Sequence, residues 1–214
     1  MPNLQAVKTS AAPKKSELKR AGRRTLIREA ALHLFSERGY DRTSLQDIAD
    51  TLGLTHPALY YYYRSKSDLL FDAIKMVMET MLADLEASIG DANLDHTEKL
   101  RQLIEMQINI QFSMQDAIRL IDSVLFGAMS RTDIFDKEQS RTLLKMQRKT
   151  VGLYKNLLKE GALSGAFKMD DETVSTFAIL GAVSNVPYWF KPNGTLSKQA
   201  AANKLADFIL KSLV

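Results

Sequence analysis

The sequence predicts an all-α protein with a small N-terminal head of three helices, including a helix-turn-helix, and a larger helical body. Apolar residues recur at three- and four-residue spacings through most of the chain, and no useful stretch alternates as a strand would. Capping sequences mark helix starts, and glycines mark helix ends. The 214 residues, 45% of them hydrophobic, suffice for a sizeable core.

Residues 1–15 mix Pro, Ser, Ala and Lys without periodicity, which indicates a flexible basic arm. From Ser16 the pattern becomes helical, and Gly39 is expected to end this first helix. Its apolar residues at helical spacings are Leu26, Ile27, Ala30, Ala31, Leu34 and Phe35.

Two short helices follow, joined by a tight turn at Gly53-Leu54-Thr55. Ser44-Leu-Gln-Asp47 is a capping box that begins the first, and Thr55 is the expected N-cap of the second. Ser65-Lys-Ser-Asp68 has the form of a second capping box and begins a long helix. Two short helices around such a turn form a helix-turn-helix, whose second helix enters the major groove in DNA-binding proteins.

Further helices are expected at about 97–114, 116–130, 136–160, 171–190 and 197–212. Residues 16–66 are therefore predicted to form the helix-turn-helix domain and residues 67–214 a larger helical body, to which the family resemblance given below assigns ligand binding and dimerisation. The uncharged stretch 173–190 is nearly long enough to cross a bilayer, but its Ser, Thr, Asn and Pro residues favour a buried interface helix. No membrane association is expected.

The net charge of +4 is unevenly distributed. Residues 1–66 carry 12 Lys and Arg against 6 Asp and Glu, a net charge of +6, and the remaining residues carry 17 against 19, a net charge of −2. A basic head points to a polyanionic partner, although a solvated tail would give the same count. The absence of cysteine excludes disulfides and thiolate sites and permits the reducing cytoplasm.

Residues 60–63 are four consecutive tyrosines, and a helix cannot bury all four because neighbouring side chains lie about 100° apart. Leu59 and Tyr63 are one turn apart and are expected to pack inside the head. Tyr60 shares a face with His56, and Tyr61 flanks that face. An exposed tyrosine can donate its hydroxyl to a phosphate oxygen. The alternative is that a small head needs aromatic filling and exposes the rest by accident.

From Gly39-Tyr40, through Thr43-Ser44, Ile48-Ala49 and the aromatic run, to Ser65-Lys66, the chain resembles the TetR family of bacterial transcriptional regulators. The resemblance covers about 50 residues. It implies an all-α homodimer that binds palindromic operator DNA, with the last two long body helices forming the dimer interface, and it implies no cofactor. The residues expected to contact DNA are Ser44, Thr55, His56, Ala58, Tyr60, Tyr61 and Lys66. Departures at residues 56, 57, 62 and 63 leave the operator sequence open.

The body is expected to bind a small apolar or amphipathic effector that releases a repressor from DNA. A similarity of the segment from Pro187 to Ser197 to family members that respond to acyl-CoA thioesters suggests that class. The apolar residues that could line a pocket are Met106, Ile110, Phe112, Met114, Leu125, Phe126 and Met129, and the polar candidates are Gln107, Asn109, Arg119 and Asp122. Ordinary core packing would explain the apolar residues equally well.

No enzyme is predicted, because the three histidines lie far apart and neither a His-Glu-x-x-His pair, a phosphate-binding glycine loop nor a Gly-x-Ser-x-Gly sequence occurs. Two other classes stay open at this point. One is an all-α carrier whose head meets a protein partner, and the other is a peripheral membrane protein that uses its basic N-terminal helix.

Overall fold

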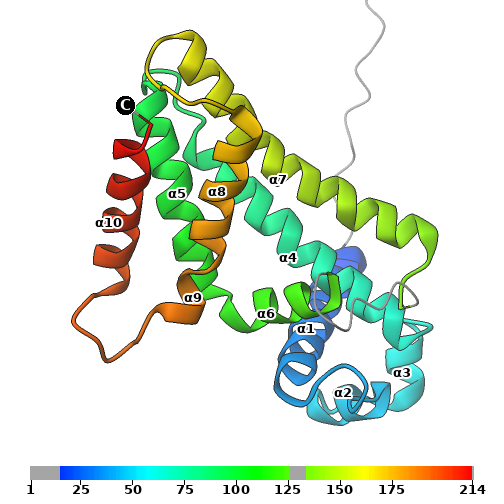
Figure 1. The fold of residues 1–214 in the computed structure, drawn as a ribbon. Coiled ribbons are helices and arrows are strands. Elements are labelled where there is room, and N and C mark those ends of the chain that lie inside the picture. Colours follow the sequence, from blue (N-terminus) through cyan, green and yellow to red (C-terminus); the bar gives the residue numbers. More distant parts are fainter. Residues whose placement is uncertain (1–14, 126–133, 214) are drawn as a thin grey trace, which may run out of the picture.

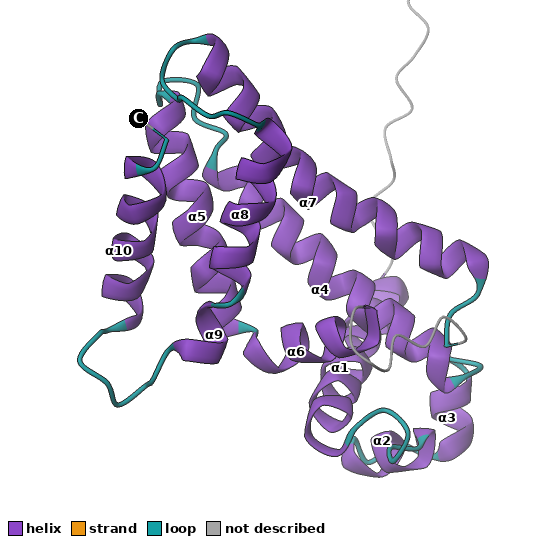
Figure 2. Ribbon diagram, viewed as in Figure 1, coloured by secondary structure: helices purple, strands orange, loops and turns teal. Residues whose placement is uncertain are grey.

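The computed structural model describes residues 15–125 and 134–213, and every regular element in these residues is a helix, which confirms the all-α prediction (Figure 2). The helices are α1 Lys15–Arg38, α2 Leu45–Thr51, α3 His56–Tyr60, α4 Lys66–Ser88, α5 His96–Ser113, α6 Gln115–Leu125, α7 Lys137–Leu163, α8 Glu172–Ser184, α9 Val186–Trp189 and α10 Lys198–Lys211.

The head consists of α1, α2, α3 and the start of α4, which gather at one end of the molecule (Figure 1). Gly39 follows α1 with φ +87°, and its N–H bonds the Phe35 carbonyl at 3.0 Å, so it ends the helix as expected. One apolar cluster fills the head, with Ile27, Phe35, Ile48, Leu59, Leu69 and Leu70 at its centre.

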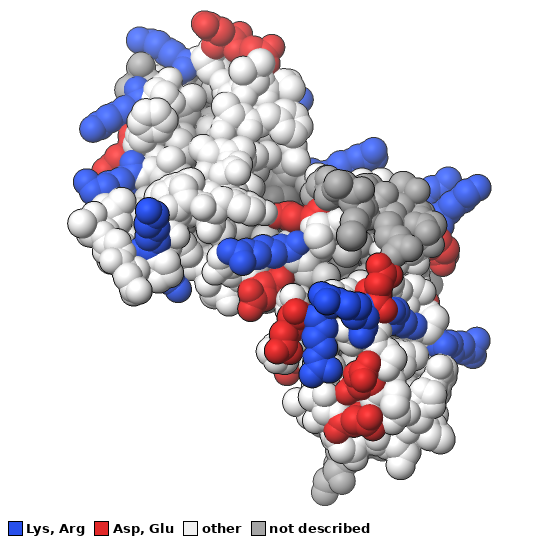
Figure 3. Space-filling model, turned by 60° about the horizontal axis from the view of Figure 1, so that its bottom comes forward, with Lys and Arg blue, Asp and Glu red and all other residues white. Residues whose placement is uncertain are grey.

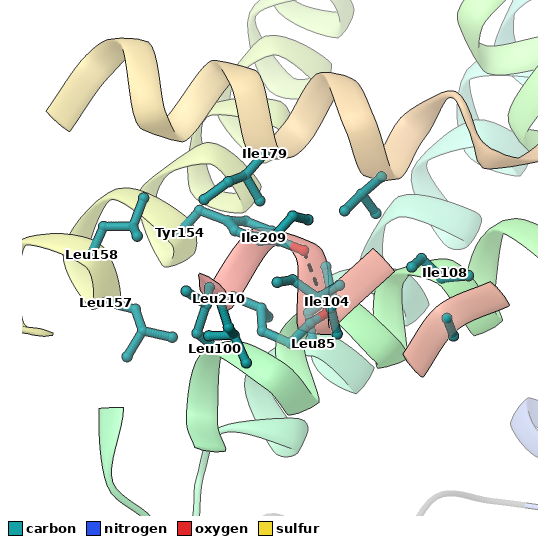
Figure 4. Packing of buried hydrophobic residues seen from close by; sticks show 14 of the residues in the cluster. Leu85, Leu100, Ile104, Ile108, Tyr154, Leu157, Leu158, Ile179, Ile209 and Leu210 are labelled. Carbon is teal, nitrogen blue, oxygen red and sulfur yellow. Dashed lines mark hydrogen bonds between the residues drawn. The ribbon is translucent and has the colours of Figure 1, made fainter. Parts of the chain in front are cut away.

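A second apolar cluster fills the body, where α5 packs against α4, α7, α8 and α10. Figure 4 shows leucines and isoleucines from these helices converging around Tyr154, a fully buried residue of α7. The helices α8, α9 and α10 lie on the side of the body away from the head (Figure 1).

Three helices contribute to both clusters: α4, α6 and α7, in which Leu143 belongs to the head cluster and Tyr154 to the body cluster. The first half of α4 packs in the head through residues such as Leu70 and Ile74, and Leu85 packs in the body. In α6, Leu120, Ile121 and Val124 belong to the head cluster and Ile118 to the body cluster. A rearrangement of the body is therefore connected to the head through α4, α6 and α7. The division at residues 66 and 67 stays a prediction, because α4 is continuous across the head and the body.

The predicted helix 171–190 is wrong in one respect, because it is divided at Asn185 into α8 and α9. Pro187 explains the break: it has no N–H to donate to the carbonyl of Val183, and its ring would collide with that carbonyl in a continuous helix. Asn185 closes α8 by donating its side-chain N–H to the Gly181 carbonyl at 2.7 Å. Among the described residues, none of the helices combines the length and apolar character that crossing a membrane requires.

The second predicted capping box is only half formed. The Ser65 hydroxyl accepts from the Asp68 N–H at 3.0 Å, but the Asp68 carboxylate accepts from the Gln139 amide at 3.1 Å. Gln139 lies in the first turn of α7, so a contact between distant helices takes the place of the local one. Of the arm predicted at residues 1–15, residues 1–14 lie outside the described residues, and Lys15 is already the first residue of α1. The end of the helix expected at 116–130 also lies outside the described residues.

Candidate nucleic-acid interface

The first short helix of the head is held by the predicted capping box. Ser44 accepts a hydrogen bond from the Asp47 N–H at 3.1 Å, and Asp47 accepts from the Ser44 N–H at 2.7 Å. The Ser44 hydroxyl also donates to the Asp47 carboxylate at 2.6 Å. This bond, followed by the one from the Ser44 N–H, holds the pKa of Asp47 below its ordinary value. Ser44 is exposed at the helix N-terminus, where a phosphate could approach, but its hydroxyl proton is already used.

The turn between α2 and α3 needs a glycine. Gly53 has φ +61°, in the left-handed region, and the next N–H, of Leu54, bonds back to the Ala49 carbonyl at 2.9 Å. Thr55 then caps α3, and its hydroxyl accepts from the Ala58 N–H at 3.4 Å. The chain reverses over three residues, which places the start of α3 at the surface. The helix-turn-helix predicted from the spacing is therefore formed.

The four tyrosines separate as the helical angles predict. Tyr63 is 3% exposed and packs in the head core, Tyr62 is half-buried, and Tyr60 and Tyr61 are 44% and 67% exposed. The Tyr60 ring meets His56 edge to face, with centroids 4.5 Å apart. The Tyr61 ring lies 5.3 Å from the guanidinium carbon of Arg20 on α1.

Five of the seven predicted contact residues are thus brought together on α3 and its two ends: Thr55, His56, Ala58, Tyr60 and Tyr61. Ala58 is half-buried, and the other four are exposed. Their chemistry combines a hydroxyl, an imidazole and two phenols, which can donate to phosphate oxygens or base edges, with little charge. The contact between Arg20 and the Tyr61 ring could not be predicted from the sequence, since no local pattern connects a residue of the first helix with Tyr61.

Lys66 is placed differently. Its ammonium group donates to the Tyr40 carbonyl at 2.8 Å and the Asp41 carbonyl at 3.4 Å, and it lies 4.3 Å from the Tyr40 ring centroid. The side chain is half-buried and attaches the start of α4 to the loop after α1. An ammonium group has three N–H donors, so a phosphate can still share it. The structure gives Lys66 a positioning role that the sequence did not predict.

A polar cluster fixes the end of the tyrosine run to α1 and α4. The buried Tyr63 hydroxyl donates to the Asp72 carboxylate and accepts from Arg24 Nε at 3.3 Å. Arg24 and Arg28 in turn lie 3.0 Å and 3.6 Å from Asp72. Burial, followed by the hydrogen bond to Asp72, raises the pKa of Tyr63 to about 12, so the phenol is neutral at physiological pH. The segment that follows α3 is therefore attached to both α1 and α4.

On the face of the head that Figure 3 shows, the charged side chains do not form a continuous basic patch. The blue Lys and Arg side chains are separated there by red acidic side chains and by uncharged surface. The exposed aromatic and hydroxyl groups of α3 therefore distinguish the helix-turn-helix more clearly than charge does on this face.

The residues that could line an effector pocket differ in burial. Ile110 is buried in the body cluster, and Met106, Phe112 and Met114 are partly buried against it. Among the polar candidates Gln107 is buried, Asp122 is half-buried with its pKa raised by burial, and Asn109 and Arg119 are exposed. Phe126 and Met129 lie outside the described residues, as does the side chain of Leu125.

Two family models match the chain. Residues 27–73 match the model described as bacterial regulatory proteins, tetR family, and residues 93–213 match the tetracyclin repressor-like C-terminal domain. The first match contains the helix-turn-helix and the start of α4, and the second covers more than half of the chain.

Individual relatives agree with these models. The chain is 22% identical to the HTH-type transcriptional repressor KstR2 of Rhodococcus jostii over 91% of this chain and 92% of that protein. It is 30% identical to the probable HTH-type transcriptional regulator ArpR of Pseudomonas putida over 72% of this chain and 75% of that protein.

Solved structures have the same fold. A TetR/AcrR-family regulator from Thermobifida fusca, 30% identical, gives a TM-score of 0.71 over 88% of this chain and 97% of that one. AibR, solved in complex with isovaleryl coenzyme A and operator DNA, is 25% identical and gives 0.73 over 89% and 97%. These proteins are regulators and not enzymes. With its helix-turn-helix, its helical body and both family models matched, the chain belongs to the TetR family of bacterial transcriptional regulators.

Proposed function

We propose that the protein is a repressor that binds a palindromic operator as a homodimer and is released by a small amphipathic ligand. The observation that carries the DNA-binding part is the outward face of α3, where His56, Tyr60 and Tyr61 lie together beside the Thr55 cap. We assign Tyr60 and Lys66 to phosphate contacts, and the N-terminus of α2 at Ser44 to a further phosphate contact through the first backbone N–H groups of that helix. Thr55, His56, Ala58 and Tyr61 are assigned to positions nearer the bases. Such a function places the protein in the cytoplasm, where the operator is.

A homodimer is supported by a second exposed apolar surface. Of the ten large hydrophobic side chains that are exposed in the described residues, five lie on α8, α9 and α10: Val174, Phe177, Tyr188, Trp189 and Phe208. The exposed positions of α8 also include Ala178 and Gly181, which allow another helix to approach closely. Apolar surface of this extent is typical of an interface between subunits. Pairing through it presents two heads to successive major grooves about 34–36 Å apart.

Ligand control is supported by the helices α4, α6 and α7, which contribute to both clusters. A ligand that binds more tightly to a body with a different arrangement of these helices also changes the separation of the heads. Only the difference in affinity between the two conformers shifts the population, and about 5.5 kcal/mol moves it almost completely. Acyl-CoA thioesters are our candidate class, since AibR was solved with isovaleryl coenzyme A.

The proposal is tested by selecting bound duplexes from a random pool with the full-length protein. We expect two inverted half-sites whose centres are about 10 base pairs apart. Isovaleryl coenzyme A, added to the selected duplex, is expected to weaken binding. A pool with no enriched sequence contradicts the DNA-binding proposal, and a single half-site contradicts the dimer. Unchanged binding with the thioester removes that ligand class and leaves the DNA proposal standing.

A further inference from the structure

Two glutamines of α5 lie inside the apolar body. Gln107 and Gln111 are each 4% exposed and share the buried stripe of the helix with Leu100, Leu103 and Ile104. Only two other residues are classed as buried and polar in the described part of the chain, Thr43 and Thr176. The Thr43 hydroxyl donates to the Gly39 carbonyl at 2.9 Å and the Thr176 hydroxyl to the Glu172 carbonyl at 2.7 Å. By contrast, the Oε1 atoms of both glutamines are buried and have no hydrogen-bond partner within the described part of the chain.

Such atoms are costly. A buried acceptor without a partner destabilises a protein by roughly 1–3 kcal/mol, and most native proteins contain few of them. Methionine or leucine would fill the same space on this stripe without that cost. The stability of the unliganded protein therefore does not explain why two amides occupy these positions.

The two glutamines lie on one face of α5. Residues four apart on a helix lie on the same face, with Cβ atoms about 5–6 Å apart. Tyr154 of α7 reaches the same side of α5, and its hydroxyl is 3.4 Å from the Leu103 carbonyl, one turn before Gln107 (Figure 4). No Lys or Arg is among the buried residues of the described body. The polar groups here are neutral.

The methionine side chains around the body cluster can adapt to a bound ligand. Met81, Met106 and Met114 pack against the body cluster, and the unbranched thioether side chain of methionine fits irregular shapes. Met81 and Met114 also pack against the head cluster, so a change in their positions reaches the head.

We propose that Gln107 and Gln111 form the polar end of the effector site and accept hydrogen bonds from N–H or O–H groups of the effector. This inference rests on the proposed ligand control and specifies the class of ligand. The effector is an amphipathic molecule with an amide or alcohol group next to an apolar body, a description that includes the amide N–H groups of an acyl-pantetheine arm. A free carboxylate does not fit this position, because its charge would be buried among apolar side chains with no buried Lys or Arg beside it in the described body.

The first test needs no ligand. Gln107→Met and Gln111→Met keep the size of the side chain and remove the acceptor, so each should raise the melting temperature of the unliganded protein by about 2–4 °C. Gln102→Met is the matched control, since Gln102 is half-buried on the same helix and its amide reaches Glu98 at 3.5 Å. A fall in melting temperature for the buried pair would mean that the amides support the fold, and it would overturn the proposal.

The second test uses decanamide and sodium decanoate, which differ in the polar group and share the apolar chain. We expect calorimetry to give at least tenfold tighter binding of decanamide by the wild-type protein, and at least a tenfold loss in the double variant Gln107→Met, Gln111→Met. Equal binding of the two probes, no binding of decanamide, or full binding by the double variant overturns the inference. The variants should still bind the selected duplex, and a wild-type protein that binds no duplex fails the proposed function instead.

Discussion

Removing the Tyr63 hydroxyl should weaken the attachment of α3 to α1 and α4. In the structure this hydroxyl donates to Asp72 and accepts from Arg24, while the ring is buried. A hydrogen bond to a charged group contributes about 1.5–3 kcal/mol. Asp72 keeps Arg24 at 3.0 Å and Arg28 at 3.6 Å after Tyr63→Phe, and phenylalanine leaves no new unpaired atom on the ring. We therefore expect a loss of about 1–1.5 kcal/mol, below the full value.

For a chain of this size, that loss lowers the melting temperature by about 2–6 °C, which differential scanning calorimetry measures directly. Tyr62→Phe is the matched control, because Tyr62 is half-buried and its hydroxyl makes no hydrogen bond to the described residues. Asp72→Asn should cost more than Tyr63→Phe, since it removes the anion that Arg24 and Arg28 share. If Tyr63→Phe and Tyr62→Phe melt within 1 °C of each other, the cluster does not hold the helix.

Three further predictions follow from the geometry. The pKa of Tyr63 is raised to about 12, so the folded chain keeps this proton after the unfolded chain has lost it, and stability should fall as the pH rises from about 10 to 12. The melting temperature, measured across this range, should decline less steeply for Tyr63→Phe than for the wild type, and identical slopes would contradict the pKa argument. Gly161→Ala should lower the free energy of unfolding in urea by about 1–3 kcal/mol, because the new Cβ would lie 2.1 Å from the buried Phe167 ring. Gly152→Ala, on the same helix, meets nothing within 4 Å and should be neutral or stabilising. Phe208→Glu should turn the proposed dimer into a monomer in sedimentation velocity, while Leu163→Glu, at an exposed position on α7, should leave it dimeric. A dimeric Phe208→Glu protein would contradict the proposed interface.

The local features of the fold could be predicted because they depend on neighbours in the sequence. The Ser44–Asp47 capping box, the Gly53 turn and the division of the tyrosines into buried and exposed faces all follow from residues within one or two helical turns. The spacing of the same residues, from Gly39 to Lys66, also resembles the TetR family, and the family could be predicted from that resemblance.

What the sequence did not predict depends on contacts between distant segments. Lys66 bonds the loop at residues 40–41, Asp68 bonds Gln139, and Arg20 lies beside Tyr61, and each pair is separated by 25 or more residues. Whether the Oε1 atoms of Gln107 and Gln111 have hydrogen-bond partners depends on which side chains the fold places around them. No pattern of spacing distinguishes a glutamine without a partner from one that is satisfied.

The face of α3 is tested most directly by removing one exposed hydroxyl and measuring affinity for the selected duplex. Tyr60→Phe keeps the ring and loses a phosphate donor, so fluorescence anisotropy should give about fivefold to tenfold weaker binding, with wild-type affinity falling steeply between 50 and 200 mM salt. Tyr188→Phe, an exposed tyrosine of α9, should bind like the wild type at concentrations where all three proteins sediment alike. Equal affinity of Tyr60→Phe and wild type, or binding that does not respond to salt, would contradict the account.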